Sequence, residues 1–139
     1  MLGESVIRGV ADADRPGVRI AVVRHHASTL ALNRIVKQAE QVVTETPDAA
    51  FDLLRSGSVS AWASVRPALL DYSERLPGSR VLEESYGANF PALVVPKGHD
   101  TRLAYMSEFV EQAKASGVVQ RAIDRAGQPG YRVAAPGER

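Results

Sequence analysis

The polar stretch Arg24–Thr29, with the sequence RHHAST, holds the residues of this chain that are best suited to binding chemistry. It follows an apolar run, Ile20–Val23, of the kind that forms a strand covered on both faces in a parallel sheet. Apolar residues at helical spacing come next, so Ser28 or Thr29 is expected to cap a helix. Open α/β sheets bind ligands at the carboxyl ends of their strands, and a helix N-terminus attracts negative charge. We therefore expect Arg24–Thr29 to face a ligand.

His25 and His26 raise the question of a metal site, with His99 as the third histidine. Adjacent residues of an extended segment point to opposite faces, so the pair is not expected to bind one ion. One imidazole, that of His25, is instead expected to line the ligand site. The sequence has no cysteine, no Gly-x-Ser-x-Gly motif, no paired carboxylates at a strand end and no phosphate-binding glycine loop. We therefore expect no metal, no cofactor and no enzymatic activity.

Length and charge exclude several classes of protein. A chain of 139 residues is about one domain and can bury a core of its own. Its 17 basic and 16 acidic residues are interspersed, so the sequence has no basic cluster of the kind that binds nucleic acid or a membrane surface. No apolar run approaches the ~20 residues of a membrane span, and the first residues lack the pattern of a secretory signal.

Turn and cap residues divide the chain into alternating strands and helices. Thr46-Pro47 is a strong helix start, and Gly57 ends that helix. A short strand is expected at 6–10, followed by five strands at 20–23, 41–45, 59–63, 80–82 and 91–95. The expected helices begin at 28 or 29, 47, 66, 100 and 118, and the third of these runs to 76. This order predicts an α/β fold: a mostly parallel five-stranded sheet flanked by helices, followed by a C-terminal helical segment.

Several of these segments carry a resemblance to a known family. In order along the chain they read AAFDLLRSG, SAWASVRPALLDY, PGSRVLEE, ALVVPKG and FVEQAKASGVVQRAIDRAG. Together they resemble the second half of a family 3 solute-binding protein, the periplasmic component of an ABC importer with the type 2 periplasmic-binding fold. The resemblance covers about Pro16–Gly127.

The resemblance implies a division of the chain. Residues 1–17 would form the first crossover between two lobes, 18–91 an α/β lobe, and 92–99 the return crossover. Residues 100–127 would be the C-terminal helices that pack on the first lobe, and 128–139 a tail. The N-terminal half of the first lobe would be missing, so this chain would offer about half of the family's ligand cleft.

The resemblance also implies ligand contacts. The family's Gly-Ser/Thr turn, which meets the ligand carboxylate, matches Ala27-Ser28-Thr29, with alanine in place of glycine. The family's aspartate for the ligand's α-ammonium falls at Val65, and a valine cannot compensate an ammonium. A carboxylate or another anion without an adjacent amine fits better, with Arg66 as its partner. The ligand-facing candidates are Arg24, His25, Ser28, Thr29, Ser64, Arg66, Tyr86 and Asn89.

Several of these residues also have a purely structural interpretation. Ser28 and Thr29 are explained by helix capping alone, and Arg66 by a solvated position in a first helical turn. Trp62, inside the third expected strand, fits a core position better than a platform for a ligand.

The resemblance implies a non-enzymatic, periplasmic solute-binding protein whose partners are a small anionic solute and a transporter permease. One alternative is a truncated or partner-dependent remnant without ligand binding of its own, and another is a dehydratase-like enzyme of the same fold. The inner faces of the C-terminal helices, including Phe109, Val110 and Ile123, are expected to be uncovered. We therefore expect self-association or a domain-exchanged dimer.

Overall fold

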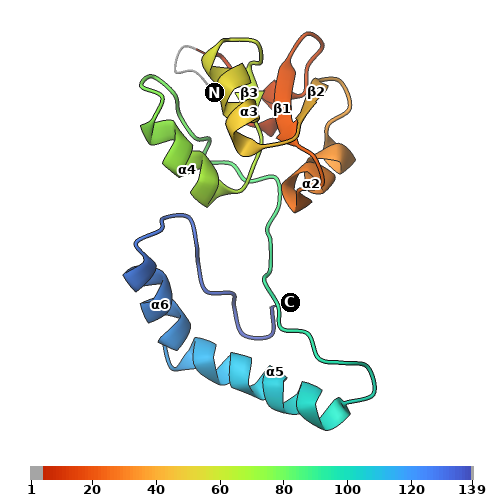
Figure 1. The fold of residues 1–139 in the computed structure, drawn as a ribbon, viewed down its shortest axis with the longest axis vertical. Helices are drawn as coiled ribbons and strands as arrows, with labels where there is room; N and C mark the ends of the chain where they lie inside the picture. The colour runs from red at the N-terminus through yellow and green to blue at the C-terminus, as the bar shows by residue number, and fades with distance from the viewer. Residues whose placement is uncertain (1–4, 139) are drawn as a thin grey trace. The chain divides into compact units, whose positions relative to one another are not determined.

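The structure, a computed structural model, describes residues 5–138. The chain divides into two compact units, Met1–Asn89 and Phe90–Arg139 (Figure 1). We call them unit 1 and unit 2 and describe each by itself. The finer domain boundaries expected from the sequence stay predictions.

A parallel three-stranded sheet forms the centre of unit 1. Its strands are β1 (Arg19–Val23), β2 (Glu40–Thr44) and β3 (Ala61–Trp62), in the order β2-β1-β3. Ile20 of β1 lies opposite Gln41 of β2 and Ala61 of β3. The central strand is buried from Ile20 to Val23, as the apolar run predicted.

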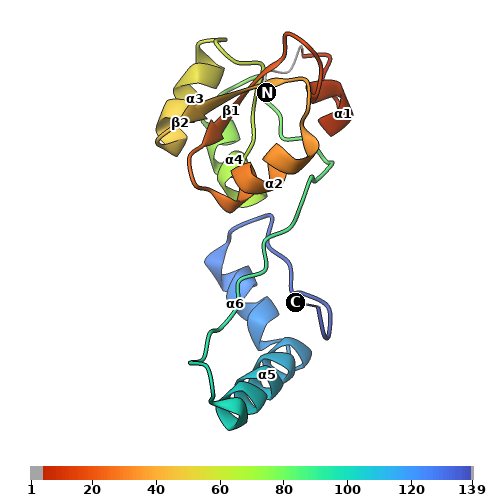
Figure 2. The ribbon, with the colours of Figure 1, turned by 90° about the vertical axis from the view of Figure 1, so that its right-hand side faces the viewer.

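Helices cover both faces of this sheet (Figures 1 and 2). Ile20 and Val22 pack with Leu32 of α2 (Ala27–Ile35), and α1 (Val10–Ala13) contributes Ala13 to the same cluster. Ala21 and Val23 pack with α3 (Pro47–Arg55), and Leu69 and Tyr72 of α4 (Arg66–Glu74) join that second cluster. Right-handed crossovers to opposite sides of β1 place α2 and α3 on opposite faces. The α/β fold is therefore confirmed.

The structure confirms the start and the end that the sequence predicted for α3. The Thr46 hydroxyl accepts a hydrogen bond from the Ala49 N–H at 3.2 Å, and Pro47 is the first helical residue. Gly57 follows the helix in the left-handed region, at φ 73°. Helix α4 begins at Arg66 as expected and ends at Glu74, two residues before the predicted end.

The number of strands differs from the prediction. Within residues 5–138 the sheet has three strands instead of five, and β3 is shorter than the expected 59–63. Residues 6–10 form no strand, since α1 begins at Val10 and Val6 is 80% exposed. Residues 80–82 and 91–95 have no ladder partner, and Val94 is 93% exposed. Residues that favour a strand locally do not form one unless a second strand is available to pair with them.

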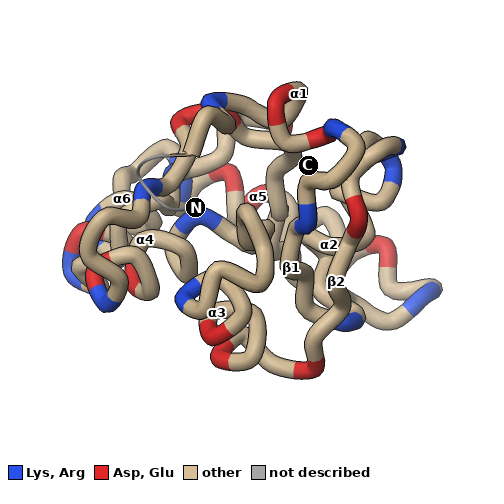
Figure 3. Tube along the Cα trace, turned by 90° about the horizontal axis from the view of Figure 1, so that it is seen from above, with Lys and Arg blue, Asp and Glu red and all other residues tan. Residues whose placement is uncertain are grey.

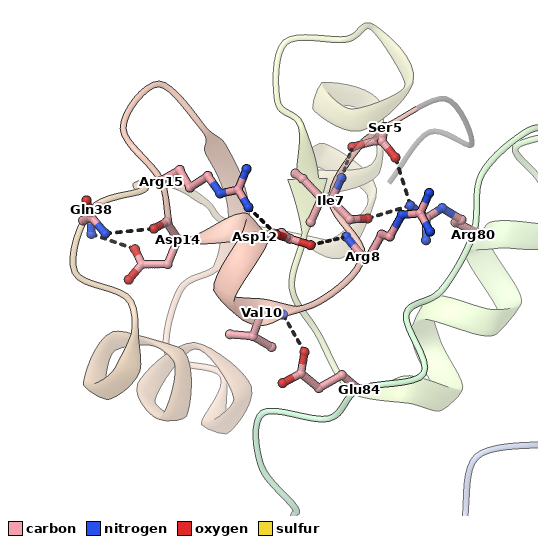
Figure 4. Close-up of polar contacts among 10 residues, drawn as sticks. All are labelled: Ser5, Ile7, Arg8, Val10, Asp12, Asp14, Arg15, Gln38, Arg80 and Glu84. Carbon is pink, nitrogen blue, oxygen red and sulfur yellow. Dashed lines mark hydrogen bonds and ion pairs between the residues drawn. The ribbon is translucent and has the colours of Figure 1, made fainter.

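Residues 80–84 are instead held by side-chain hydrogen bonds to residues 5–10, which we call the leading segment (Figure 4). The Arg80 guanidinium donates to the carbonyl oxygens of Ser5, at 3.0 Å, and Ile7, at 2.6 Å. The Glu84 carboxylate accepts a hydrogen bond from the Val10 N–H at 2.7 Å, at the start of α1. A Cβ built on Gly9 would meet the Glu84 carboxylate, so a larger residue here would require that side chain to move.

Asp14 joins the end of α1 to the loop between α2 and β2. Its carboxylate accepts hydrogen bonds from the backbone N–H groups of Lys37, Gln38 and Ala39, at 3.0, 2.7 and 3.0 Å. These three hydrogen bonds hold the pKa of the carboxyl below its ordinary value, and the bond from Ala39 has the largest effect. The ionised side chain therefore supports this loop.

Unit 2 consists of α5 (Asp100–Ala115), α6 (Val118–Ala126) and a returning tail. Gly117, at φ 77°, separates the two helices, which begin at Asp100 and Val118 as the sequence predicted. The tail is held along α5: the Lys114 ammonium donates to the Ala135 carbonyl at 2.9 Å, and Glu111 accepts from the Gly137 N–H at 3.2 Å. None of residues 90–138 is buried.

Across residues 5–138, no helix has both the length and the apolar character that crossing a membrane requires.

We predict that Asp14→Asn lowers the free energy of unfolding at pH 7. Because the folded-state pKa of Asp14 is depressed, its contribution is present above the ordinary value and is lost as the pH falls below about 4. The difference between the wild type and the variant should therefore shrink at low pH. Urea unfolding followed by circular dichroism at neutral and acidic pH measures this.

Asp52→Asn is the matched control, because Asp52 pairs only with the exposed Arg55 on the surface of α3. Exposed pairs of this kind contribute little. A difference between wild type and Asp14→Asn that stays constant from neutral to acidic pH would contradict the role assigned to the ionised carboxylate.

Candidate functional site

The carboxyl ends of β1 and β3 form the edge of the sheet where a ligand is expected. From β1 the chain crosses to β2 on one side, and it later returns to β3 on the other side. This reversal makes the β1/β3 boundary a topological switch point, the place where open α/β sheets bind ligands. Residues 24–26 lead from β1 into α2, and residues 63–65 lead from β3 into α4.

A left-handed residue turns the chain from β1 into α2. His25 has φ 61°, and no other non-glycine residue within 5–138 has a positive φ. Histidine tolerates this region better than most residues do. The His26 N–H then donates to the Val23 carbonyl at 3.3 Å, and His26 is the N-cap of α2. Both imidazoles are exposed at this edge.

Ser28 and Thr29 do not cap α2, contrary to the prediction. Both lie inside the first turn and are buried. The Thr29 hydroxyl donates to the Val23 carbonyl at 2.7 Å, which fastens the helix to the end of β1. Thr29 therefore has a structural role, because its hydroxyl proton is already used inside the protein.

Tyr86 lies beside Ser28, from which it is far removed in the sequence. Its ring packs on the cluster that includes Leu32 of α2, and a Cβ built on the neighbouring Gly87 would lie 3.7 Å from the Ala31 Cβ. The Tyr86 hydroxyl is shielded from solvent and makes no hydrogen bond of standard geometry, even with Ser28. Burial raises the pKa of Tyr86, and the nearby Ser28 hydroxyl acts in the opposite direction with a smaller effect.

The two arginines of the candidate set lie at different parts of the edge. Arg24 pairs with Glu45, its Nε 2.7 Å from the carboxylate, on the β2 side of β1. Arg66 donates to the Glu83 carbonyl at 2.8 Å, which ties the start of α4 to the segment that carries Tyr86. Arg66 is therefore more than a solvated first-turn residue, and Arg24 faces away from the switch point.

The remaining candidates are placed as follows. Ser64 is half-buried between β3 and α4, and Asn89 is exposed at the end of unit 1. Trp62 belongs to the core, with its ring 4.9 Å from that of Tyr72 in an edge-to-face arrangement. The structure thus places Tyr86 beside Ser28, and it joins Arg66 to the carbonyl of Glu83, three residues before Tyr86. The ligand-binding role of each stays a prediction.

The distribution of charges and of potential metal ligands completes the description of this edge. Figure 3 shows basic and acidic residues interspersed along the trace. In the described part of the chain, no three His, Cys, Asp or Glu side chains are grouped so that they could hold a metal ion. Sequence reasoning missed the contribution of Glu83, because its carbonyl oxygen, which no side-chain pattern reveals, is what contacts Arg66.

No protein family and no curated protein matches the sequence. Solved structures that share the fold include the following two. An ancestral arginine-binding protein bound to glutamine has a TM-score of 0.67 and 20% sequence identity, over 93% of this chain and 56% of that one. An ancestral cyclohexadienyl dehydratase has a TM-score of 0.53 and 21% identity, over 86% of this chain and 50% of that one.

These likenesses confirm the predicted fold, one lobe of the type 2 periplasmic-binding fold. This chain spans about half the length of the two solved chains it matches. One of the two is named for binding and the other for catalysis, so the fold alone does not choose between these activities.

We predict that Thr29→Val lowers the free energy of unfolding by about 1 kcal/mol, because it removes a buried hydrogen bond without changing the shape of the side chain. Urea unfolding followed by circular dichroism measures the change. Thr101→Val, at an exposed position of α5, is the control and should change the stability by less than about 0.5 kcal/mol. Equal stability of the two variants would show that the Thr29 bond does not hold α2 to β1.

Proposed function

We propose that this chain is the solute-binding lobe of an ABC-importer binding protein and that it holds a small anionic solute at the switch point between β1 and β3. The observation that carries the proposal is the position of Tyr86 beside Ser28, in the first turn of α2, on a segment that Arg66 holds through the Glu83 carbonyl. The fold shared with an arginine-binding protein supports a role in solute binding.

The charge of the residues at this edge supports an anion without an amine. The segments that directly follow the two strands, 24–29 and 63–67, contain two arginines, two histidines and no carboxylate. Arg24 is already paired with Glu45, so Arg66 is the arginine that can serve an anion here. Val65, the N-cap of α4, offers no charge that would compensate an ammonium. An unpaired charge buried against protein costs several kcal/mol. A carboxylate, sulfonate or phosphate therefore suits the edge better than an α-amino acid does.

The affinity of the isolated chain should be weak. Two or three hydrogen bonds to a charged ligand contribute about 1.5–3 kcal/mol each before the cost of association. Millimolar binding corresponds to about −4 kcal/mol, which such a set of contacts supplies. The proposal therefore calls for a dissociation constant on the order of millimolar.

Catalysis by the same edge is the second candidate, and the dehydratase of this fold is the observation that favours it. His25 and His26 are the exposed groups that could transfer a proton there. We propose binding without catalysis, because the segments after β1 and β3 offer no carboxylate to act with an imidazole. A periplasmic location and a permease partner belong to the same proposal.

A titration followed by two-dimensional amide NMR tests the proposed solute class. Succinate is compared with aspartate, and 3-phenylpropionate with phenylalanine, because each pair differs only in the α-ammonium group. We expect shifts of the amides of Ala27–Thr29 and Val65–Arg66 with the plain carboxylates and weaker shifts with the amino acids. A stronger response to the amino acids would refute the anion proposal, and no response to any compound would favour a partner-dependent remnant.

The variant Val65→Asp provides a second test of the solute class by the same titration. Aspartate is a good N-cap, so the variant should keep α4 intact while adding the carboxylate that an ammonium needs. We expect it to favour the amino acid of each pair relative to the wild type. Val65→Asn is the matched control, since it caps equally well without the charge.

We also propose that copies of this chain associate through unit 2. Its 50 residues include no buried side chain among 90–138, and Leu103, Phe109 and Val118 are each 52% exposed. A unit of this size without a core needs to be covered. In a solution of this chain alone, a second copy of the chain is the partner available to cover this surface.

Sedimentation velocity over a range of protein concentrations tests this association. We expect dimers or larger species to grow with concentration and Phe109→Glu to shift the distribution toward monomer. Ser107→Glu, which adds the same charge two residues away at an exposed position without removing apolar surface, is the control. A wild-type chain that stays monomeric at the highest concentration would contradict the proposal.

A further inference from the structure

The Tyr86 hydroxyl is a buried polar group whose hydrogen bond is not made. Buried hydroxyls are normally hydrogen-bonded, and leaving one unpaired is unfavourable. Three buried side-chain atoms within residues 5–138 lack a hydrogen-bond partner: Gln41 Oε1, Trp62 Nε1 and the Tyr86 hydroxyl. Trp62 packs with Tyr72 on the opposite face of the sheet, and Gln41 belongs to β2. Tyr86 is the one of the three that lies beside Ser28.

The segment around Tyr86 is held at several points, so the phenol is not free to turn toward another partner. Arg80 and Glu84 fasten the segment to the leading residues of unit 1 (Figure 4). Arg66 of α4 holds the Glu83 carbonyl, and Gly87 passes close to Ala31 of α2. The Tyr86 hydroxyl is therefore positioned by contacts from both faces of the sheet.

The chemistry of this hydroxyl calls for an acceptor. Burial raises the pKa of Tyr86, so the phenol is protonated at neutral pH and offers a donor. The phenol and Ser28 stand side by side without an acceptor aimed at the phenol proton. An anionic oxygen is a stronger acceptor than a neutral one, because the bond is charge-assisted.

We infer that Tyr86 is a specificity-determining residue: an oxygen of the bound solute enters between the Ser28 and Tyr86 side chains and accepts the hydrogen bond that the phenol lacks in the free chain. This inference rests on the proposed binding function. Because the hydroxyl is shielded from solvent, the solute oxygen reaches it as the Ser28 side chain turns aside, while the Tyr86 segment stays anchored. The free chain is then less stable than it would be without the hydroxyl, and binding removes that disadvantage.

Tyr86→Phe separates this role from a structural one, because the two roles predict opposite signs. We expect the variant to unfold at a higher urea concentration than the wild type, followed by the fluorescence of the single tryptophan, Trp62. We expect its affinity for succinate, from the NMR titration, to fall by about tenfold or more. Tyr131→Phe, at a tyrosine that is 53% exposed in unit 2, is the control and should change neither quantity.

Each other result overturns the inference. If Tyr86→Phe unfolds at a lower urea concentration, the hydroxyl is satisfied within the protein, by Ser28, and is a structural group. If wild type and variant bind succinate equally, the proposed function stands and the role of Tyr86 falls. If the wild type shows no response to succinate, phosphate or methanesulfonate, the binding function falls together with this inference.

Discussion

Burial of β1 on both faces is the constraint on which unit 1 depends. Ile20 and Val22 point into one cluster, and Ala21 and Val23 point into the other, so each face of the strand must be covered by helices. The backbone groups of β1 are satisfied by β2 on one side and β3 on the other. Once these pairs form, right-handed crossovers fix which helix covers which face.

The same constraint creates the binding edge. Strand β1 is central, with β2 on one side and β3 on the other. The chain therefore has to leave the carboxyl end of β1 through a tight turn. His25 takes the left-handed conformation there, and the Thr29 hydroxyl holds α2 against the end of the strand. The arrangement exposes polar groups at the sheet edge while the residues behind them are committed to packing.

The segment from Arg80 to Gly87 shows how charged side chains take over where a strand is not formed. Arg80 and Glu84 satisfy backbone groups of the leading segment, and Arg66 satisfies the Glu83 carbonyl. These bonds hold the segment beside α2 without a ladder. Unit 2 has no comparable support: its tail is tied to α5, but none of residues 90–138 is buried.

Local pattern alone determined most of the helices and the central strand. The apolar run at Ile20–Val23, the cap at Thr46 and the break at Gly117 all act within a few residues, and each was read correctly from the sequence. The same local reading placed strands at 80–82 and 91–95 that have no partner in the described structure. A strand exists only where a second strand pairs with it, so the tertiary structure decided the sheet. It likewise decided the site: Thr29 is bound to Val23, and Tyr86 stands beside Ser28, because packing brings together residues that no spacing in the sequence connects.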